Sequence, residues 1–270
     1  MRIAVFIKRV LDPEIPAALF RLDAEAKDAR VPDAPYVMGP YDENALEVAL
    51  AVKDRDPETY VEVISYGPRE AEEILRKALS VGADEAVLVL DEGGAQDVFS
   101  VGAVLAAAAR NRGLPDLLLF GLQSGDWDSG QTAFVVAELL GAASVSYAAA
   151  VELEPKGGVR VRRILEDASE EILVPRGPVA MSVTSSGENA LRMAKVRDIL
   201  MAARKKITYL SAADLALQPR ERIRVAAVAA LEGRQVSCTF MAGDDAAAKG
   251  RALVQRLLAE RMIQGEAQCM

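Results

Sequence analysis

The chain has 270 residues, 51% of them hydrophobic and 27% charged, with a formal net charge of −8 and no histidine. This composition allows a large buried core and argues against disorder, and the acidic balance argues against a nucleic-acid binder held by phosphate contacts. The lack of histidine excludes Ser-His and Cys-His catalysis, and Cys238 and Cys269 alone cannot hold an iron–sulfur cluster or a cysteine-rich zinc site. Any redox chemistry therefore needs a bound organic cofactor.

Strands and helices alternate along the first half of the chain. Four apolar runs have the length and composition of buried parallel strands: 3–7, 61–65, 86–90 and 117–120. Helical spacing of apolar residues occurs at about 40–54, 69–80, 99–112 and 133–140. This alternation predicts βαβ units with right-handed crossovers, so we expect an α/β fold with a Rossmann-like parallel sheet. No G-x-G-x-x-G follows the first strand, and residues 12–35 are expected to form a hairpin or an irregular excursion.

The pattern changes after Gly141. Strand-like segments at 144–153 and 159–165 flank Glu154-Pro155-Lys156-Gly157-Gly158, which predicts a hairpin. Further short strands are expected at 172–175 and 179–183, and the segments 207–210 and 211–217 follow without an assigned structure.

The last part of the chain is predicted to contain a helix from about Asp245 to Met262, with Asp244 or Asp245 as its cap. We expect this part to be either an arm or a small strand–helix unit that closes the sheet. The first residues lack the pattern of a signal peptide, and no apolar run has the length of a membrane span. A cytoplasmic protein without membrane insertion is therefore expected.

A polar loop, Gly121–Thr132, lies between the fourth strand and the helix that follows it. This order places flexible backbone and free helix-terminal N–H groups at the carboxyl end of a sheet, where open α/β sheets bind ligands. We expect Asp128 or Ser129 to cap the helix. The side chains then available for a phosphate or a sugar are Gln123, Ser124, Gln131 and Thr132. The same residue types favour a simple turn, so the loop alone leaves both interpretations open.

Several short motifs occur in an order that is typical of one known family. They are Val5-Phe6-Ile7-Lys8-Arg9-Val10, Pro40-Tyr41-Asp42-Glu43, Gly67-Pro68, Leu75-Arg76-Lys77-Ala78-Leu79 with Gly82-Ala83-Asp84, Gly121-Leu122-Gln123 with Asp126, Asp128 and Gln131, Glu188-Asn189, Met201-Ala202-Ala203-Arg204-Lys205-Lys206-Ile207 and Ala213-Asp214-Leu215. Each motif alone is weak, but together they make residues 1–217 resemble the β subunit of electron transfer flavoprotein (ETF).

The resemblance implies an adenine nucleotide α-hydrolase-like domain at 1–217, which forms a heterodimer with a larger α subunit, and a C-terminal arm at 218–270 that packs on that subunit. It implies an FAD shared with the α subunit and a second adenine nucleotide in this chain, AMP in simple carriers or a second FAD in the bifurcating branch. By position, the nucleotide site comprises Phe6, Gly39, Pro40, Tyr41, Asp42, Tyr66, Gln123, Ser124, Gly125, Asp126, Trp127, Asp128, Ser129, Gly130, Gln131 and Thr132. Phe6 and Tyr66 are expected to flank the adenine, and Asp126 to contact ribose hydroxyls or the loop backbone.

Four residues of this site region depart from the family pattern. Leu122 replaces a lysine, which removes a positive charge near the phosphate, and Gly39 replaces an asparagine. Gly125 stands in place of an apolar residue. Trp127 stands in place of an acid, and it either stacks on a ring or merely covers the loop.

A second departure concerns the segment Met193–Ile199, which corresponds to the loop with which simple carriers of the family grip their dehydrogenases. Lys195, Arg197 and Asp198 occupy the place of a familiar Leu-Pro. The expected partner-binding residues are Lys195, Val196 and Ile199, and the resemblance implies a dehydrogenase other than the usual acyl-CoA enzymes.

Three functions remain open at this stage. The first is electron transfer from a flavin dehydrogenase to a quinone-linked acceptor, with AMP bound structurally in this chain. The second is electron bifurcation with a second FAD and NADH as donor. The third is a stand-alone adenine-nucleotide-binding protein without a redox partner. No residue is assigned a catalytic or metal-binding role in any of them.

Overall fold

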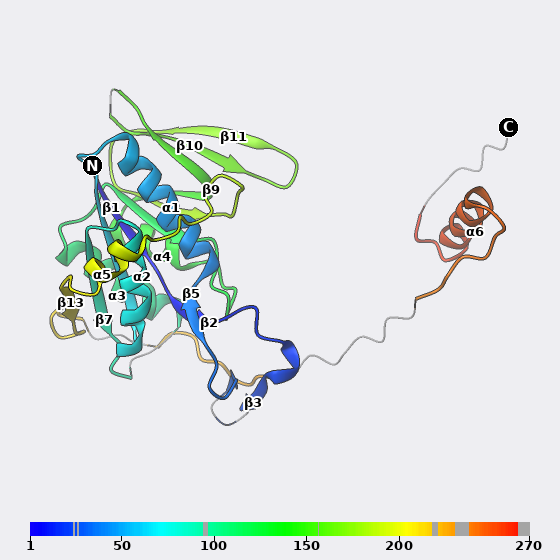
Figure 1. The fold of residues 1–270 in the computed structure, drawn as a ribbon, viewed down its shortest axis with the longest axis horizontal. Coiled ribbons are helices and arrows are strands. Elements are labelled where there is room, and N and C mark those ends of the chain that lie inside the picture. Colours follow the sequence, from blue (N-terminus) through cyan, green and yellow to red (C-terminus); the bar gives the residue numbers. More distant parts are fainter. Residues whose placement is uncertain are drawn as a thin grey trace. The chain divides into compact units, whose positions relative to one another are not determined.

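A β-sheet forms the centre of the fold. The computed structural model describes residues 1–23, 25, 27–93, 97–155, 157–217, 221–229 and 238–263. Within them the strands of the sheet are β1 (Arg2–Phe6), β6 (Tyr60–Gly67), β7 (Glu85–Leu90), β8 (Leu117–Gly121), β9 (Ala143–Leu153), β10 (Val159–Ile164), β11 (Ser169–Val174), β12 (Val179–Val183) and β13 (Ile207–Leu210). Their order across the sheet is β11-β10-β9-β12-β8-β1-β6-β7-β13 (Figure 1).

The sheet is parallel from β12 to β13. Ile3 of β1 lies opposite Val61 on one side and Leu117 on the other. These central strands are buried on both faces, which explains why they read as continuous apolar runs instead of alternating patterns. β9 pairs parallel with β12 and, further along, antiparallel with β10, and β10 pairs antiparallel with β11. The predicted hairpin after Gly141 is therefore confirmed.

Helices cover both faces of the sheet. α1 (Pro40–Arg55) and α2 (Glu72–Val81) pack on one face, where they share a core with residues of β1, β6 and β8. α3 (Val98–Asn111) and α4 (Thr132–Leu140) pack on the other. α5 (Val196–Ala202) lies against α2. The predicted helix at 69–80 is divided into a 3₁₀ turn, η2 (Arg69–Ala71), and α2.

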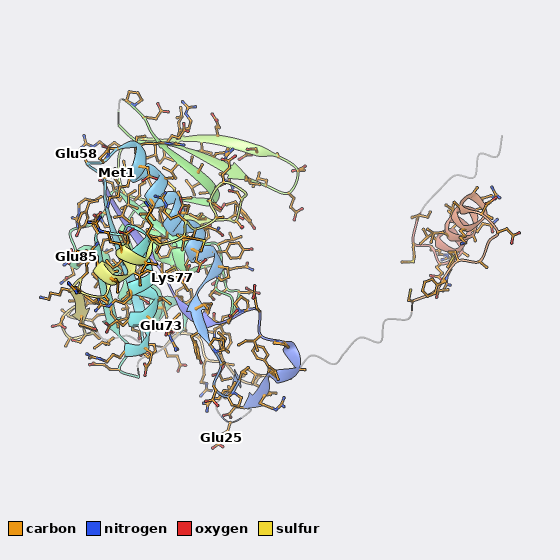
Figure 2. The ribbon with its side chains drawn as sticks, viewed as in Figure 1. Met1, Glu25, Glu58, Glu73, Lys77 and Glu85 are labelled. Carbon is orange, nitrogen blue, oxygen red and sulfur yellow. The ribbon has the colours of Figure 1, made fainter. Side chains whose placement is uncertain are left out.

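The predicted excursion at 12–35 contains a real hairpin. β3 (Arg21–Asp23) pairs with β4 (Asp28–Arg30), η1 (Ala17–Leu19) precedes them, and β2 (Arg9–Leu11) pairs with β5 (Tyr36–Met38). The side chain of Arg9 donates a hydrogen bond to Glu73 of α2, which is labelled in Figure 2, and lies over the ring of Tyr36. The base of the excursion is therefore tied to the main body.

The strand order reverses at β1. The chain runs from β1 to β6 and β7 on one side and then crosses to β8 on the other. The carboxyl ends of β1 and β8 therefore flank the topological switch point, which is where open α/β sheets bind ligands. The polar loop Gly121–Thr132 follows β8 at this point.

The chain divides into two compact units, Met1–Val228 and Ala229–Met270. α6 (Ala246–Ala259) lies in the second unit, and Asp245 caps it by accepting a hydrogen bond from the N–H of Ala248 at 2.6 Å, which confirms that cap. The sequence predicts either an arm or a strand–helix unit for this part. The described residues 221–229 and 238–263 contain no strand, so no strand–helix unit is present in them. None of the helices described is long and apolar enough to cross a membrane.

Candidate functional site

The loop after β8 and the amino end of α1 meet at the switch point. A Cβ atom on Gly121 would lie 2.4 Å from Oδ1 of Asp42 and 2.9 Å from the carbonyl carbon of Tyr41, so only glycine permits this approach. A Cβ on Gly125 would be 4.0 Å from Pro40. The structure thus brings together two groups of predicted site residues that are about 80 positions apart in the sequence.

Asp42 joins three elements at this point. Its carboxylate accepts hydrogen bonds from the backbone N–H of Lys8, at 2.7 Å, and of Gly121, at 3.1 Å. Lys8 lies two residues beyond the end of β1, and Gly121 is the last residue of β8. Burial raises the pKa of the Asp42 carboxyl to about 7, although both hydrogen bonds act in the opposite direction. Asp42 therefore links α1 to the ends of β1 and β8, and its predicted contact with a nucleotide stays a prediction.

Lys8 supplies a cation to the loop. Its Nζ lies 2.6 Å from Oδ2 of Asp126, and the N–H of Trp127 donates to the other carboxylate oxygen at 2.9 Å. Burial disfavours the ionised form of Asp126, but the charge of Lys8 and the hydrogen bonds from Lys8, Ser124 and Trp127 lower its pKa below the usual value. The expectation that Asp126 contacts the loop backbone is therefore confirmed, whereas its contact with a ribose stays a prediction.

The amino end of α4 carries no side-chain cap. We expected Asp128 or Ser129 to cap this helix, but the helix begins at Thr132, its N-cap residue is Gln131, and no side chain accepts a bond from its first N–H groups. The prediction fails because Asp128 and Gly130 adopt left-handed backbone conformations, with φ of 49° and 59°, and so turn the chain before the helix begins. The N–H of Phe134 already donates to the carbonyl of Gln131 at 3.1 Å, so the donors left for a ligand at this terminus are the N–H groups of Thr132 and Ala133.

The aromatic residues of the predicted site differ in exposure. Phe6 is only 4% exposed and stacks on Phe120, with ring centroids 4.3 Å apart, so its face is covered by the protein itself. Tyr66 donates a hydrogen bond to Asp91 at 3.1 Å, and burial together with that carboxylate raises its pKa. Trp127 is 55% exposed. Phe120 covers one face of the Phe6 ring, and the contact of Phe6 and Tyr66 with an adenine stays a prediction.

The segment 186–203 forms a second surface, on the side of α1 and α2. Arg192 binds Glu47 and Asp54 of α1, each at 2.7 Å, and the side chain of Asn44 donates to the carbonyl of Asn189 at 2.9 Å. Arg76 of α2 donates to the carbonyl of Ala202 at 2.9 Å and to that of Lys205. The segment is therefore anchored at both ends.

The predicted partner residues lie between these anchors. Val196 is 76% exposed and Ile199 is 51% exposed, and both belong to α5, as does the apolar Leu200. Lys195 precedes the helix and is also exposed. The structure thus places all three predicted residues on one exposed surface, but their contact with a partner stays a prediction.

Sequence reasoning missed several residues that shape these two surfaces. Lys8 belonged to a quoted motif, but nothing in the sequence pairs it with Asp126. Phe120 was assigned to a strand, and its stacking on Phe6 depends on the pairing of β1 with β8. The acidic partners of Arg192, which lie about 140 positions away from it, give no signal in the local sequence.

Comparison with known proteins agrees with this geometry. A family model described as the electron transfer flavoprotein domain matches residues 31–215. Subunit CarD of the caffeyl-CoA reductase–Etf complex of Acetobacterium woodii is 34% identical over 220 residues, which cover 81% of each chain. The ETF β subunit of Bradyrhizobium diazoefficiens is 30% identical over 235 residues, 87% of this chain and 91% of that one. The ETF β subunit of Mycobacterium bovis is 30% identical over an alignment of 273 positions, with 97% of this chain and 99% of that one covered. The α/β fold, the family model and these relatives together show that the chain belongs to the electron transfer flavoprotein β-subunit family.

Proposed function

We propose that this chain is the β subunit of a heterodimeric electron carrier. It binds an adenine nucleotide at the switch point, completes the FAD site of an α subunit, and takes electrons from a flavin dehydrogenase for a quinone-linked acceptor. The observation that carries the proposal is the uncapped amino end of α4, which follows a loop whose first residue, Gly121, contacts the amino end of α1. Free N–H groups at a helix start favour an anionic ligand.

The donors at the switch point fit one phosphate better than three. The N–H groups at the start of α4 and the side chains of Gln131 and Thr132 would hold phosphate oxygens. The charge of Lys8 is already paired with the carboxylate of Asp126. Asp128 adds a second carboxylate, so the loop has no surplus of positive charge. AMP is therefore the nucleotide we propose.

The flavin, when bound with the α subunit, supplies the electron-carrying chemistry. The residues described here would bind, orient and shield. Asp42 and Gly121 fix the distance between α1 and the loop, and Lys8 holds the loop through Asp126.

A second candidate function is favoured by one relative. CarD is named as a subunit of a complex between a reductase and an Etf. By this analogy the nucleotide site would hold a second FAD, with NADH as donor. A pyrophosphate has two phosphate groups in place of one, and the uncapped α4 terminus can hold the second only with donors from the α subunit.

We also propose that residues 218–270 form an arm on the α subunit. None of the residues of α6 is buried, and its exposed apolar side chains include Leu253, Val254 and Leu258. An amphipathic helix that buries nothing gains its stability from a partner.

Identification of the bound nucleotide tests the proposal. The chain is co-expressed with its α subunit, the complex is purified and denatured, and the released nucleotides are identified by mass spectrometry. One FAD and one AMP per heterodimer are expected, whereas two FAD would select the second candidate. A colourless, partnerless monomer without nucleotide would contradict both.

A matched pair of glycine variants assigns the nucleotide to the loop. Gly130→Ala and Gly157→Ala both place a Cβ on a left-handed residue, with φ of 59° and 84°, at a cost of about 1–2 kcal/mol. Only Gly130→Ala alters the loop before α4, so it alone should lower the nucleotide content. Equal loss in both variants would place the nucleotide elsewhere.

A further inference from the structure

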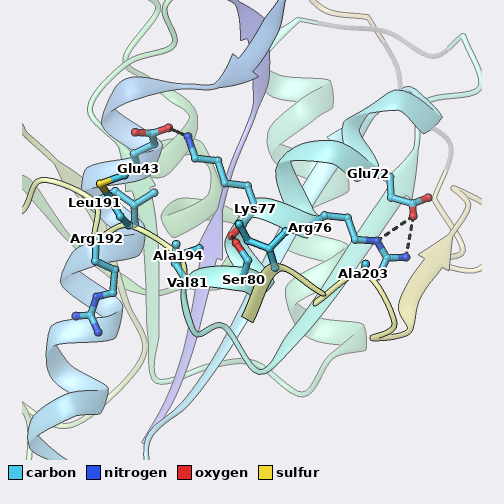
Figure 3. Close-up of a pocket in the computed structure, with 12 residues that line it drawn as sticks. Glu43, Glu72, Arg76, Lys77, Ser80, Val81, Leu191, Arg192, Ala194 and Ala203 are labelled. Atoms are coloured by element: carbon cyan, nitrogen blue, oxygen red, sulfur yellow. Dashed lines mark hydrogen bonds and ion pairs between the residues drawn. The ribbon is translucent and has the colours of Figure 1, made fainter. Parts of the chain in front are cut away.

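A groove lies beneath the anchored segment 186–203. It has a volume of about 750 Å³ and is bounded by α2, by the amino end of α1 and by residues 191–203 (Figure 3). Its small and apolar lining consists of Ser80, Val81, Leu191, Met193, Ala194, Ile199 and Ala203. This volume is in the range of pockets that take a ligand or a protruding side chain.

The charged groups in the groove are already paired. Lys77 reaches across to Glu43, and Arg76 binds Glu72 at 2.8 Å (Figure 3). The hydroxyl of Ser80 donates to the carbonyl of Lys77 at 2.7 Å. Since these groups satisfy one another, a charged occupant would find no free counter-charge, and an apolar one costs no hydrogen bond.

An exposed apolar row continues the lining of the groove on the outside. It consists of Met193, Val196, Ile199, Leu200 and Met201, and Met193 is 95% exposed. Met193 and Ile199 belong both to this row and to the groove. Five exposed large apolar side chains within residues 193–201 are more than scattered surface positions, and such gatherings mark protein–protein contacts.

Positive charge surrounds the apolar row. Residues 195–206 include five cations, Lys195, Arg197, Arg204, Lys205 and Lys206, and one carboxylate, Asp198, in a chain whose net charge is −8. All of these side chains are exposed. Within the described residues, Lys195, Arg197, Arg204 and Lys206 form no ion pair, whereas the neighbouring Arg192 and Arg76 do. This basic rim is therefore complementary to an acidic surface.

The rim and the groove are held in place before any partner arrives. Arg192 fixes the entry of the segment to α1, and Arg76 fixes its exit to α2. Lys205 adds a hydrogen bond to the carbonyl of Ala83 at 2.9 Å. A preorganised surface loses little conformational entropy on binding.

We propose that this groove receives an apolar side chain of the partner dehydrogenase, and that the partner surrounds that side chain with carboxylates which meet the basic rim. The proposal rests on the proposed function, because it names the chemistry of the partner that docks at Lys195, Val196 and Ile199. The proposal assigns two features to this surface, which was predicted only by its position: the groove, called the socket below, and the basic rim.

Defined peptides test the socket without knowledge of the partner. The probe is a fluorescein-labelled peptide, Asp-Glu-Asp-Leu-Phe-Asp-Glu-Asp, titrated by anisotropy against the purified heterodimer at two salt concentrations. One comparison peptide has lysine in place of every acid, and another has alanine in place of Leu-Phe. We expect the acidic apolar peptide to bind best, with each comparison peptide about tenfold weaker, which corresponds to about 1.4 kcal/mol. Binding should weaken as salt rises from about 0.05 to 0.15 M, because screening shortens the range of the rim's field.

Variants of the chain separate the socket from the rim. Ser80→Leu fills the groove from α2, and Ala194→Leu fills it from the segment above, so both should weaken the acidic apolar peptide about tenfold. The Lys195→Gln/Arg197→Gln double variant should weaken it and flatten the salt dependence. Ser169→Leu, on the exposed strand β11, is the matched control and should change nothing.

The outcomes distinguish this inference from the proposed function. The flavin content of each preparation reports whether the heterodimer exists, independently of the peptides. A flavin-containing heterodimer that binds all three peptides alike, or that keeps its affinity when both groove-filling variants fold, overturns the socket. A flavin-free chain that binds the peptides in the expected order would support the socket and contradict the proposed function as an electron carrier.

Discussion

The contact between Gly121 and Asp42 allows a quantitative prediction. Replacement of Gly121 by alanine adds a Cβ that would lie 2.4 Å from Oδ1 of Asp42 and 2.9 Å from both the backbone nitrogen of Asp42 and the carbonyl carbon of Tyr41. Two of these atoms are backbone, so the amino end of α1 must move away from β8. The movement also breaks the hydrogen bond from Gly121 to the Asp42 carboxylate.

The cost has two parts. Overpacking of a well-packed site costs about 1–3 kcal/mol. At about pH 8, above the pKa of about 7 of Asp42, loss of a hydrogen bond to the charged carboxylate costs about 1.5–3 kcal/mol. Gly121→Ala should therefore lower the free energy of unfolding by about 3–5 kcal/mol, a large part of the stability of a typical domain. Urea unfolding followed by circular dichroism measures it.

Gly125→Ala is the matched control for this prediction. It lies in the same loop, and its Cβ would find its nearest neighbours at 3.9 and 4.0 Å, which is ordinary contact. It should change the free energy of unfolding by less than about 1 kcal/mol. If the two variants were equally stable, the close approach of α1 to β8 would not be the constraint that we describe.

Three further predictions concern single side chains. The pKa of Asp42 is raised from 3.8 to about 7 in the folded state. The stability that this group contributes is therefore present below about pH 4 and is lost as the pH rises toward 7. The difference in unfolding free energy between the wild type and Asp42→Asn, measured from pH 4 to 8, should fall over that window, and a flat difference would refute this prediction. Asp97 caps α3 through the N–H of Phe99 at 3.0 Å, and Asp97→Ala should cost about 1 kcal/mol in urea unfolding, whereas no loss would mean that the cap is replaced by solvent. Lys8→Met should raise the pKa of Asp126, which NMR titration can follow, and lower the nucleotide content of the purified heterodimer; an unchanged Asp126 titration would show that the ion pair is not populated.

The fold was predictable where local pattern and tertiary structure agree. The runs at 3–7 and 117–120 read as buried strands because both faces of β1 and β8 are covered. The hairpin after Gly141 was predictable from its turn residues, and the cap at Asp245 from a local hydrogen bond. The hairpin and the cap each depend on an interaction that spans only a few residues, and the buried strands could be recognised from the continuous apolar runs within them.

The site was predictable in position but not in the roles of its residues. The order strand, polar loop and helix located the candidate site at the switch point. The motif at 40–43 supplied the residues of α1 that face the loop. The cap of α4 failed because the backbone turns at Asp128 and Gly130 before the helix can use an oxygen of either predicted residue. Asp42 bonds to Gly121 and Phe6 stacks on Phe120, and in each pair the partner is more than 70 positions away, whereas the contact of either residue with a ligand stays a prediction. Such long-range contacts leave no mark in the local sequence.

The position of Trp127 gives this protein an internal optical reporter. It is the one tryptophan of the chain, and it lies half exposed on the loop between β8 and α4. Indole emission shifts with the polarity around the ring, so the intrinsic fluorescence of this subunit comes from one known point beside Asp126. Spectroscopy of the unlabelled chain can thus follow events at the loop without interference from any other indole of the same polypeptide.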